Sequence, residues 1–219
     1  MAAPDERRAR LRAARLYLVI EAAPARDVVP AALAGGVDVV QLREKGAGDD
    51  EVVAAGRALR SLCDEHGALL IVNDRADLAL ACGADGVHVG QDDAAVDDVR
   101  ASVGPELVIG FSTHTPAQVE AASGASGVDY LGVGPVYPTA TKPGLEPVGL
   151  ELVRYASAHV SKPWFAIGGI DRARTDAVAA AGAERVAVVR AIRDAADPGE
   201  AAAALREAIL REPVGGQAK

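Results

Sequence analysis

Residues 164–189 read WFAIGGIDRARTDAVAAAGAERVAVV, and this stretch contains one complete strand–helix–strand unit. Trp164–Ile167 is a short apolar run that predicts a buried strand. Asp171 stands where an N-cap would begin a helix over Arg172–Ala181, and the glycine that follows is placed to end that helix. Arg185–Val189 predicts the next strand. Strict alternation of strand and helix favours parallel strands joined by right-handed crossovers.

The same alternation runs through the rest of the chain. Further strands are predicted at Leu16–Ile20, Val37–Leu42, Leu69–Val72, Gly86–Val89, Leu107–Phe111 and Val128–Val133. Eight strand–helix units in 219 residues match the lower size of a (β/α)8 barrel. The rival fold, an open doubly wound sheet, would show a GxGxxG fingerprint at the first helix, and this chain lacks it. We therefore predict an α/β fold: a single (β/α)8 TIM barrel over residues 16–219, preceded by a short N-terminal helix or arm over residues 1–15.

Composition excludes several classes of function. The chain has 31 acidic and 23 basic residues, a balance that disfavours general nucleic-acid binding. No apolar run approaches the roughly 18 residues of a membrane span, and the first residues lack the apolar core of a signal peptide. Cys63 and Cys82 lie in helix-like stretches without metal spacing, so we read them as reduced buried thiols. We expect a cytoplasmic protein without a nucleic-acid or membrane partner, and the sequence allows a homo-oligomer.

In such a barrel the chemistry lies after the carboxyl ends of the strands. Gln41, Arg43 and Lys45 alternate after the second predicted strand and would share one side of the chain. An amide and two cations on one side suit an oxyanion such as a diphosphate. The alternative is a solvated strand end in which Glu44 pairs with a lysine.

Acidic residues follow the next two strands. Asp74, after Asn73, and Asp93 would end neighbouring strands, so both carboxylates could reach one point near the barrel axis. Two carboxylates with open positions suit a Mg²⁺ that also grips a diphosphate. Capping turns would equally explain each acid taken alone. No histidine pair has the spacing of a zinc hydrolase.

The remaining strand ends carry hydroxyls, glycines and one long loop. Ser112 could donate to a phosphate oxygen. His114 is read as a supporting or capping residue, and a catalytic base is the alternative. The loop after the sixth strand is the longest irregular segment, and its donors predict a lid or binding loop: Thr139, Thr141 and Lys142. Gly168 and Gly169 would let a phosphate approach the main chain before a helix. Two anion sites at the same end of the barrel suit an enzyme that joins two phosphorylated molecules or transfers a diphosphate.

Six ordered motifs between about Leu16 and Ile192 resemble the thiamine phosphate synthase family: QLREK at 41–45, VND at 72–74, GVHVGQDD at 86–93, GFS at 110–112, GVGPVYPTATK at 132–142 and IGGI at 167–170. The resemblance implies a Mg²⁺-dependent barrel enzyme. It would join 4-amino-2-methyl-5-hydroxymethylpyrimidine diphosphate to 4-methyl-5-(2-phosphoethyl)thiazole, or to its carboxylated precursor, giving thiamine monophosphate and diphosphate. It also implies a dissociative mechanism, in which the bond to the diphosphate breaks before the thiazole nitrogen attacks.

The resemblance also assigns residues. The pyrimidine diphosphate would contact Gln41, Arg43, Lys45, Asn73, Ser112 and Lys142, of which Arg43, Lys45, Ser112 and Lys142 are expected to be catalytic. Mg²⁺ would bind Asp74 and Asp93. The thiazole phosphate would contact Thr139, Thr141, Gly169, Val189 and Arg190, where Arg190 departs from members with serine there. The aromatic content of 3% argues against an aromatic cage for a cationic intermediate.

Two alternatives stay open. A thiazole tautomerase-like relative would share the phosphate site, but that family uses a histidine in the loop after the sixth strand, and here Pro135 follows Gly134. A non-catalytic sensor of phosphorylated metabolites should have lost the metal pair, and Asp74 and Asp93 are both present.

Overall fold

The computed structural model describes residues 3–139 and 144–211. Eight parallel strands form a closed barrel in chain order, which confirms the predicted fold. The strands are β1 Leu16–Ile20, β2 Val39–Leu42, β3 Leu69–Asn73, β4 Gly86–Val89, β5 Val108–Thr113, β6 Tyr130–Val133, β7 Trp164–Ile167 and β8 Val186–Val188.

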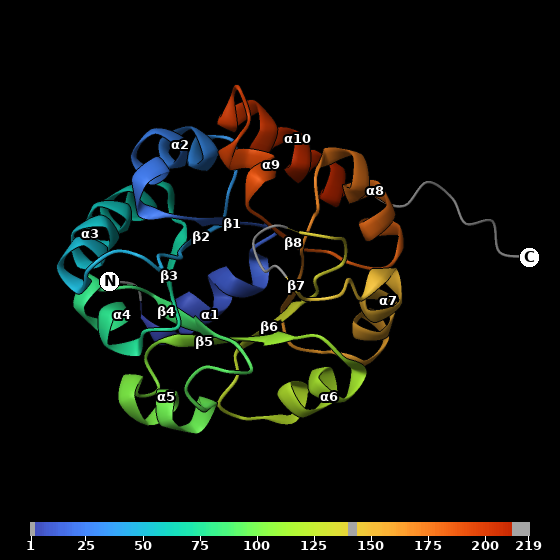
Figure 1. The fold of residues 1–219 in the computed structure, drawn as a ribbon, viewed down its shortest axis with the longest axis horizontal. Helices are drawn as coiled ribbons and strands as arrows, with labels where there is room; N and C mark the ends of the chain where they lie inside the picture. The colour runs from blue at the N-terminus through green and yellow to red at the C-terminus, as the bar shows by residue number, and fades with distance from the viewer. Residues whose placement is uncertain (1–2, 140–143, 212–219) are drawn as a thin grey trace, which may run out of the picture.

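Helices surround the barrel as an outer ring (Figure 1). The helices are α1 Pro4–Ala13, which lies apart from this ring, α2 Ala22–Ala34, α3 Asp49–His66, α4 Ala76–Cys82, α5 Val96–Val103, α6 Pro116–Gly124, α7 Gly149–His159, α8 Arg172–Ala180, α9 Arg190–Arg193 and α10 Pro198–Leu210. The predicted N-cap Asp171 is confirmed, and Thr115 and Asp197 begin α6 and α10 in the same way: the side chain of each accepts a hydrogen bond from the backbone nitrogen three residues later.

Successive strand residues alternate between two packing environments. Leu16, Leu18 and Ile20 of β1 pack outward in a core shared with the helices, whereas Tyr17 and Val19 belong to a separate cluster inside the barrel. This inner cluster continues through Val39, Leu69, Ile71, Val108, Tyr130, Phe165 and Ala187. The barrel is therefore filled by apolar and aromatic side chains in its interior, below the end at which the strands finish.

Helix α1 lies across the end of the barrel where the strands begin, behind the strands in Figure 1. Its Leu11 packs into the inner cluster. Arg7 is 1% exposed, and its Nε donates to Asp85 Oδ1 at 3.1 Å. Thus α1 packs directly on the barrel; the division into units of 1–15 and 16–219 stays a prediction.

None of the helices in residues 3–139 and 144–211 combines the length and apolar character that crossing a bilayer requires.

Candidate active site

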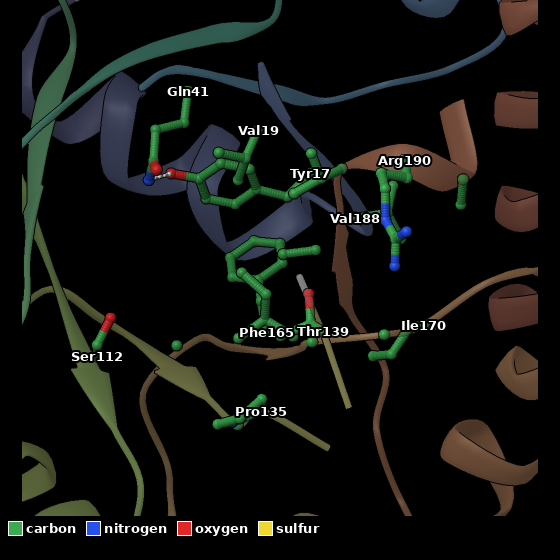
Figure 2. A pocket seen from close by; sticks show the side chains of 18 of the residues that line it. Tyr17, Val19, Gln41, Ser112, Pro135, Thr139, Phe165, Ile170, Val188 and Arg190 are labelled. Carbon is green, nitrogen blue, oxygen red and sulfur yellow. Dashed lines mark hydrogen bonds between the residues drawn. The ribbon is translucent and has the colours of Figure 1, made fainter. Parts of the chain in front are cut away.

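A cavity of about 350 Å³ opens at the carboxyl end of the barrel (Figure 2). Of the residues that the family resemblance assigns to the two substrates, those that line it are Gln41, Arg43, Asn73, Ser112, Thr139, Gly169, Val189 and Arg190. Residues from β2, β3, β5, β8 and the loops after β6 and β7 therefore converge as the barrel topology requires. Thr141 and Lys142 lie outside the described residues.

The floor of the cavity is aromatic, which the sequence argument did not anticipate. Tyr17, Tyr130 and Phe165 line it and contact one another edge-on or tilted, with ring centroids 5.1–6.1 Å apart. A low aromatic content gives the number of aromatic residues but does not show whether they lie together in the fold. The period-two alternation that placed Gln41 on the inner side, applied to every strand, would have placed these rings inside as well.

One wall carries positive charge. Arg43 lines the cavity. Lys45, Asp74 and Asp93 are not among its lining residues, and Lys45 Nζ lies 3.7 Å from Asp74 Oδ2. Gln41 is buried, and its Nε2 donates to Tyr17 Oη at 2.7 Å. The structure thus brings Gln41 and Arg43 into the cavity. It places Lys45 beside Asp74, one of the two predicted metal ligands.

Asp74 has φ +62°, in the left-handed region that aspartate tolerates better than most residues. Burial and a hydrogen bond with the Asp93 carboxyl raise the pKa of Asp74, while Lys45 and Arg43 oppose that increase. Asp93 Oδ2 also accepts from the backbone nitrogen of Gly90 at 2.7 Å. Two carboxylates close enough to share a proton are a donor set that a hard divalent cation fits, because the cation would replace their mutual repulsion with attraction.

The described residues contain no group of three or more His, Cys, Asp or Glu side chains arranged to hold a metal. A cation at Asp74 and Asp93 would complete its coordination with water and ligand oxygens, as Mg²⁺ commonly does in phosphate sites. These residues fit Mg²⁺ better than Zn²⁺, which favours nitrogen and sulfur ligands.

Ser112 is 8% exposed, and its Oγ lies 2.9 Å from His88 Nε2. His88 lines the same cavity and was missed as a site residue by the sequence reasoning. His114 also lines the cavity; its ring Nδ1 bonds to the carbonyl oxygen of Gly134, and its backbone nitrogen donates to Gln118. These contacts agree with a supporting role for His114.

The opposite wall forms a backbone cup. Gly168 and Gly169 have φ +103° and +63°, and a Cβ at either position would lie within 2.7 Å of Pro135 or Pro138 atoms. Glycine is therefore required here by both conformation and space. Arg190 points into the cavity from the β8 side (Figure 2).

Arg174 of α8 also lines this wall and was not predicted. Its guanidinium lies 5.0 Å from the centre of the Tyr137 ring, and its Nη1 donates to the carbonyl oxygen of Gly169 at 2.7 Å. The signal that could have found it is its position in the first turn of a helix that begins beside the glycine pair, since anions bind at such helix starts.

The family model described as thiamine monophosphate synthase matches residues 16–192. The chain belongs to the thiamine monophosphate synthase family. The resemblance and the prediction of a transferase are therefore confirmed. The chain is 56% identical to the thiamine-phosphate synthase of Gloeobacter violaceus over 93% of its own length, and covers 60% of that relative. It is 51% identical to the thiamine-phosphate synthase of Saccharopolyspora erythraea, covering 91% of this chain and 94% of that one.

Solved structures agree with this family. The thiamine phosphate pyrophosphorylase of Pyrococcus furiosus aligns with a TM-score of 0.82 at 35% identity, over 92% of this chain and 96% of that chain. A 3-hexulose-6-phosphate synthase aligns with a TM-score of 0.64 at 21% identity, over 89% of this chain and 99% of that chain, and shows the shared barrel alone. The curated relatives do not favour the tautomerase-like and sensor alternatives, since they are named as synthases.

Proposed function

We propose that the cavity joins 4-amino-2-methyl-5-hydroxymethylpyrimidine diphosphate to 4-methyl-5-(2-phosphoethyl)thiazole, or to its carboxylated precursor. The products are thiamine monophosphate and diphosphate; the carboxylated precursor would in addition lose carbon dioxide and take up one proton at the same ring carbon. The observation that carries the proposal is a single cavity with Arg43 on one wall, Arg190 and a glycine cup on the other, and aromatic rings on its floor. Membership of the thiamine monophosphate synthase family supports the same reaction.

The cationic wall suits the diphosphate. Arg43 and Lys45 would neutralise the charge that collects on the leaving diphosphate, and Ser112 Oγ would add a hydrogen bond to it. Asn73, at the carboxyl end of β3, would hold the same substrate. Asp74 and Asp93 would hold Mg²⁺, which when bound supplies further positive charge to diphosphate oxygens. Lys142 is proposed for the same set from the family pattern.

The glycine cup suits the phosphate of the thiazole. Gly169, Val189 and Arg190 line that wall, and Thr139 lines the cavity beside them. Backbone N–H groups at a glycine turn, together with a guanidinium, are the groups that bind a terminal phosphate. Thr141 is proposed here on the family pattern alone. Placing the two anions on opposite walls brings the two reacting heterocycles together over the aromatic floor.

We propose a dissociative order of events. The bond between the pyrimidine methylene carbon and the diphosphate oxygen breaks first, and its electron pair leaves with the diphosphate. The thiazole nitrogen then donates its lone pair to the methylene carbon. No proton has to be transferred in these steps, so the chain needs no general base. The rings of Tyr17 and Phe165 form a floor that excludes water while the carbon is cationic.

The test is diphosphate release from the purified protein with both substrates, with each alone, and with and without Mg²⁺. Release that needs both substrates and the metal supports the proposal. Release from the pyrimidine diphosphate alone would mean that water captures the cation, and the second substrate would be wrong. No release under any condition would contradict the activity.

We also propose that small phosphorylated substrates are the partners, with no nucleic acid or membrane surface involved. A cytoplasmic location is proposed with them, because Cys63 and Cys82 are both free and buried. Cell fractionation that found the protein with membranes or outside the cytoplasm would contradict this part.

A further inference from the structure

A continuous series of hydrogen bonds crosses the cavity floor and joins two residues that the proposed function places on the pyrimidine substrate. Gln41 Nε2 donates to Tyr17 Oη at 2.7 Å, and Tyr17 Oη lies 3.0 Å from Tyr130 Oη. His88 Nδ1 lies 3.1 Å from Tyr130 Oη, and its Nε2 lies 2.9 Å from Ser112 Oγ. We call these five side chains the floor relay; they come from five different strands. Figure 2 shows the Gln41 and Tyr17 end.

The relay has a direction because each tyrosine has a single hydroxyl proton. Tyr17 accepts from the Gln41 amide, so its own proton is available to Tyr130. Tyr130 then donates a hydrogen bond to His88 Nδ1, so this must be the unprotonated ring nitrogen. His88 Nε2 therefore carries the ring proton and donates a hydrogen bond to Ser112 Oγ. The two ends are left with opposite character: within residues 3–139 and 144–211, the Gln41 carbonyl oxygen remains as an acceptor and the Ser112 hydroxyl proton as a donor.

The packing around His88 is built to hold its ring in this place. A Cβ at Gly110 would lie 2.4 Å from His88 Nδ1 and 2.2 Å from Tyr130 Cζ. A Cβ at Gly132 would lie 3.3 Å from His88 Cε1. Glycine at these positions of β5 and β6 therefore makes room for the imidazole. Tyr17 and Tyr130 are buried, and burial raises the pKa of both hydroxyls, which keeps them protonated and the relay complete.

We propose that His88 is a positioning residue, which acts through the floor relay on both of its ends. The relay turns the Gln41 carbonyl oxygen toward the exocyclic amino group of the pyrimidine and leaves the Ser112 hydroxyl to donate to a diphosphate oxygen. This inference rests on the proposed function for the identity of the substrate. The direction of the relay is a property of the protein alone.

The first test needs no substrate. Nitrogen NMR of the ¹⁵N-labelled protein reports which ring nitrogen of each histidine carries the proton, and the chain has only four histidines. His88→Gln assigns the signals of His88. We expect an unprotonated Nδ1 and a protonated Nε2, and Tyr130→Phe should shift the Nδ1 signal by removing its donor. A proton on Nδ1, or on both nitrogens, overturns the proposed direction.

The second test is kinetic. His88→Leu should lower kcat for diphosphate release by about tenfold or more, because Ser112 loses its partner. His88→Gln, whose amide can still reach Ser112, should recover part of that loss. In a Ser112→Ala background, His88→Leu should cause less than about a twofold further loss. Tyr17→Phe should instead raise KM for the pyrimidine diphosphate, since it frees the Gln41 amide to rotate.

Two surface variants serve as controls. Tyr155→Phe and His159→Gln make the same chemical changes on α7, away from the cavity, and should leave both kinetic constants unchanged. Equal losses in His88→Gln and His88→Leu, or additive losses with Ser112→Ala, would overturn the positioning role. If neither Asp93→Ala nor Ser112→Ala altered diphosphate release, the proposed function would fail instead, while the NMR result would still stand.

Discussion

Asp93 is the second of two consecutive acids after β4, and it is the one whose carboxyl interacts with Asp74. If this pair holds the metal, Asp93→Ala should lower turnover by a factor of about 100 or more. The fold should be retained, because the residue lies in a loop. Steady-state diphosphate release over a Mg²⁺ titration measures the change, together with the thermal midpoint.

Asp92→Ala is the matched control, since it removes the neighbouring exposed carboxylate. We expect it to keep wild-type turnover and the wild-type Mg²⁺ requirement. Full activity in Asp93→Ala with Mg²⁺ still required would move the metal to other ligands.

Side chains next to strand ends could be placed in the cavity from sequence, because the topology alone brings strand ends together. Gln41, Arg43 and Ser112 are of this kind. The floor relay could not be foreseen in the same way. It depends on hydroxyl groups of Tyr17 and Tyr130, which are far apart in the chain and meet only through the register of the closed barrel.

Cys63 illustrates how burial alone sets reactivity. Desolvation raises the pKa of the Cys63 thiol to about 12, with the nearby guanidinium of Arg60 opposing it. The thiol should therefore remain protonated and resist alkylation at pH 8 in the native state, and react once the protein is unfolded. Because the folded pKa lies above that of the unfolded chain, this group favours unfolding as the pH rises above about 9. Rapid modification of Cys63 in native protein would contradict the burial.

Three of the eight strands are each preceded by an aspartate at the end of the connecting loop. Asp38, Asp85 and Asp129 stand before β2, β4 and β6, and the carboxylate of each accepts a backbone N–H from the strand before it: Leu16, Leu70 and Ile109, respectively. This explains why β2 and β6 begin two residues later than predicted at Val37 and Val128. Apolar content marked the strand interiors correctly, but an isolated sequence does not show which aspartate reaches a neighbouring strand.

Helix α3 packs against α4 through a glycine. A Cβ at Gly56 would lie 2.3 Å from Cys82 Sγ and 2.9 Å from its Cβ. Gly56→Ala should therefore lower the free energy of unfolding by about 1–3 kcal/mol, although alanine is the better helix former. Thermal or urea denaturation measures this. Cys82→Ala in the same chain should restore part of the loss by making room.

Gly124 on α6 provides the comparison, because a Cβ there meets nothing within 4 Å. Gly124→Ala should be neutral or slightly stabilising. Equal destabilisation by both substitutions would show that helix–helix contact does not set the cost at Gly56.

The two ends of the barrel have different roles: one holds the candidate active site, and the other contributes to stability. The cavity occupies the end where the strands finish, whereas α1 closes the end where they start and brings Arg7 to Asp85. Asp85 also pairs with Arg60 and accepts from the backbone nitrogen of Leu70, so it joins α1, α3 and β3. Arg7 Nη2 has no hydrogen-bond partner among the described residues. Burying this unpaired donor costs free energy, while the ion pairs of the cluster fix how α1 packs on the barrel.

Removing the Arg7 charge should therefore affect the fold and spare the reaction. Arg7→Met keeps much of the side-chain volume but leaves Asp85 short of one partner, and should cost about 3 kcal/mol of unfolding free energy. That loss corresponds to a fall of roughly 6–12 °C in the thermal midpoint. Arg8→Met breaks a partly exposed pair with Asp129 and should cost less than about 1 kcal/mol. Both variants should keep wild-type kcat at 25 °C, since neither residue approaches the cavity. A fall in kcat with Arg7→Met in fully folded protein would show that the end of the barrel closed by α1 transmits strain to the site.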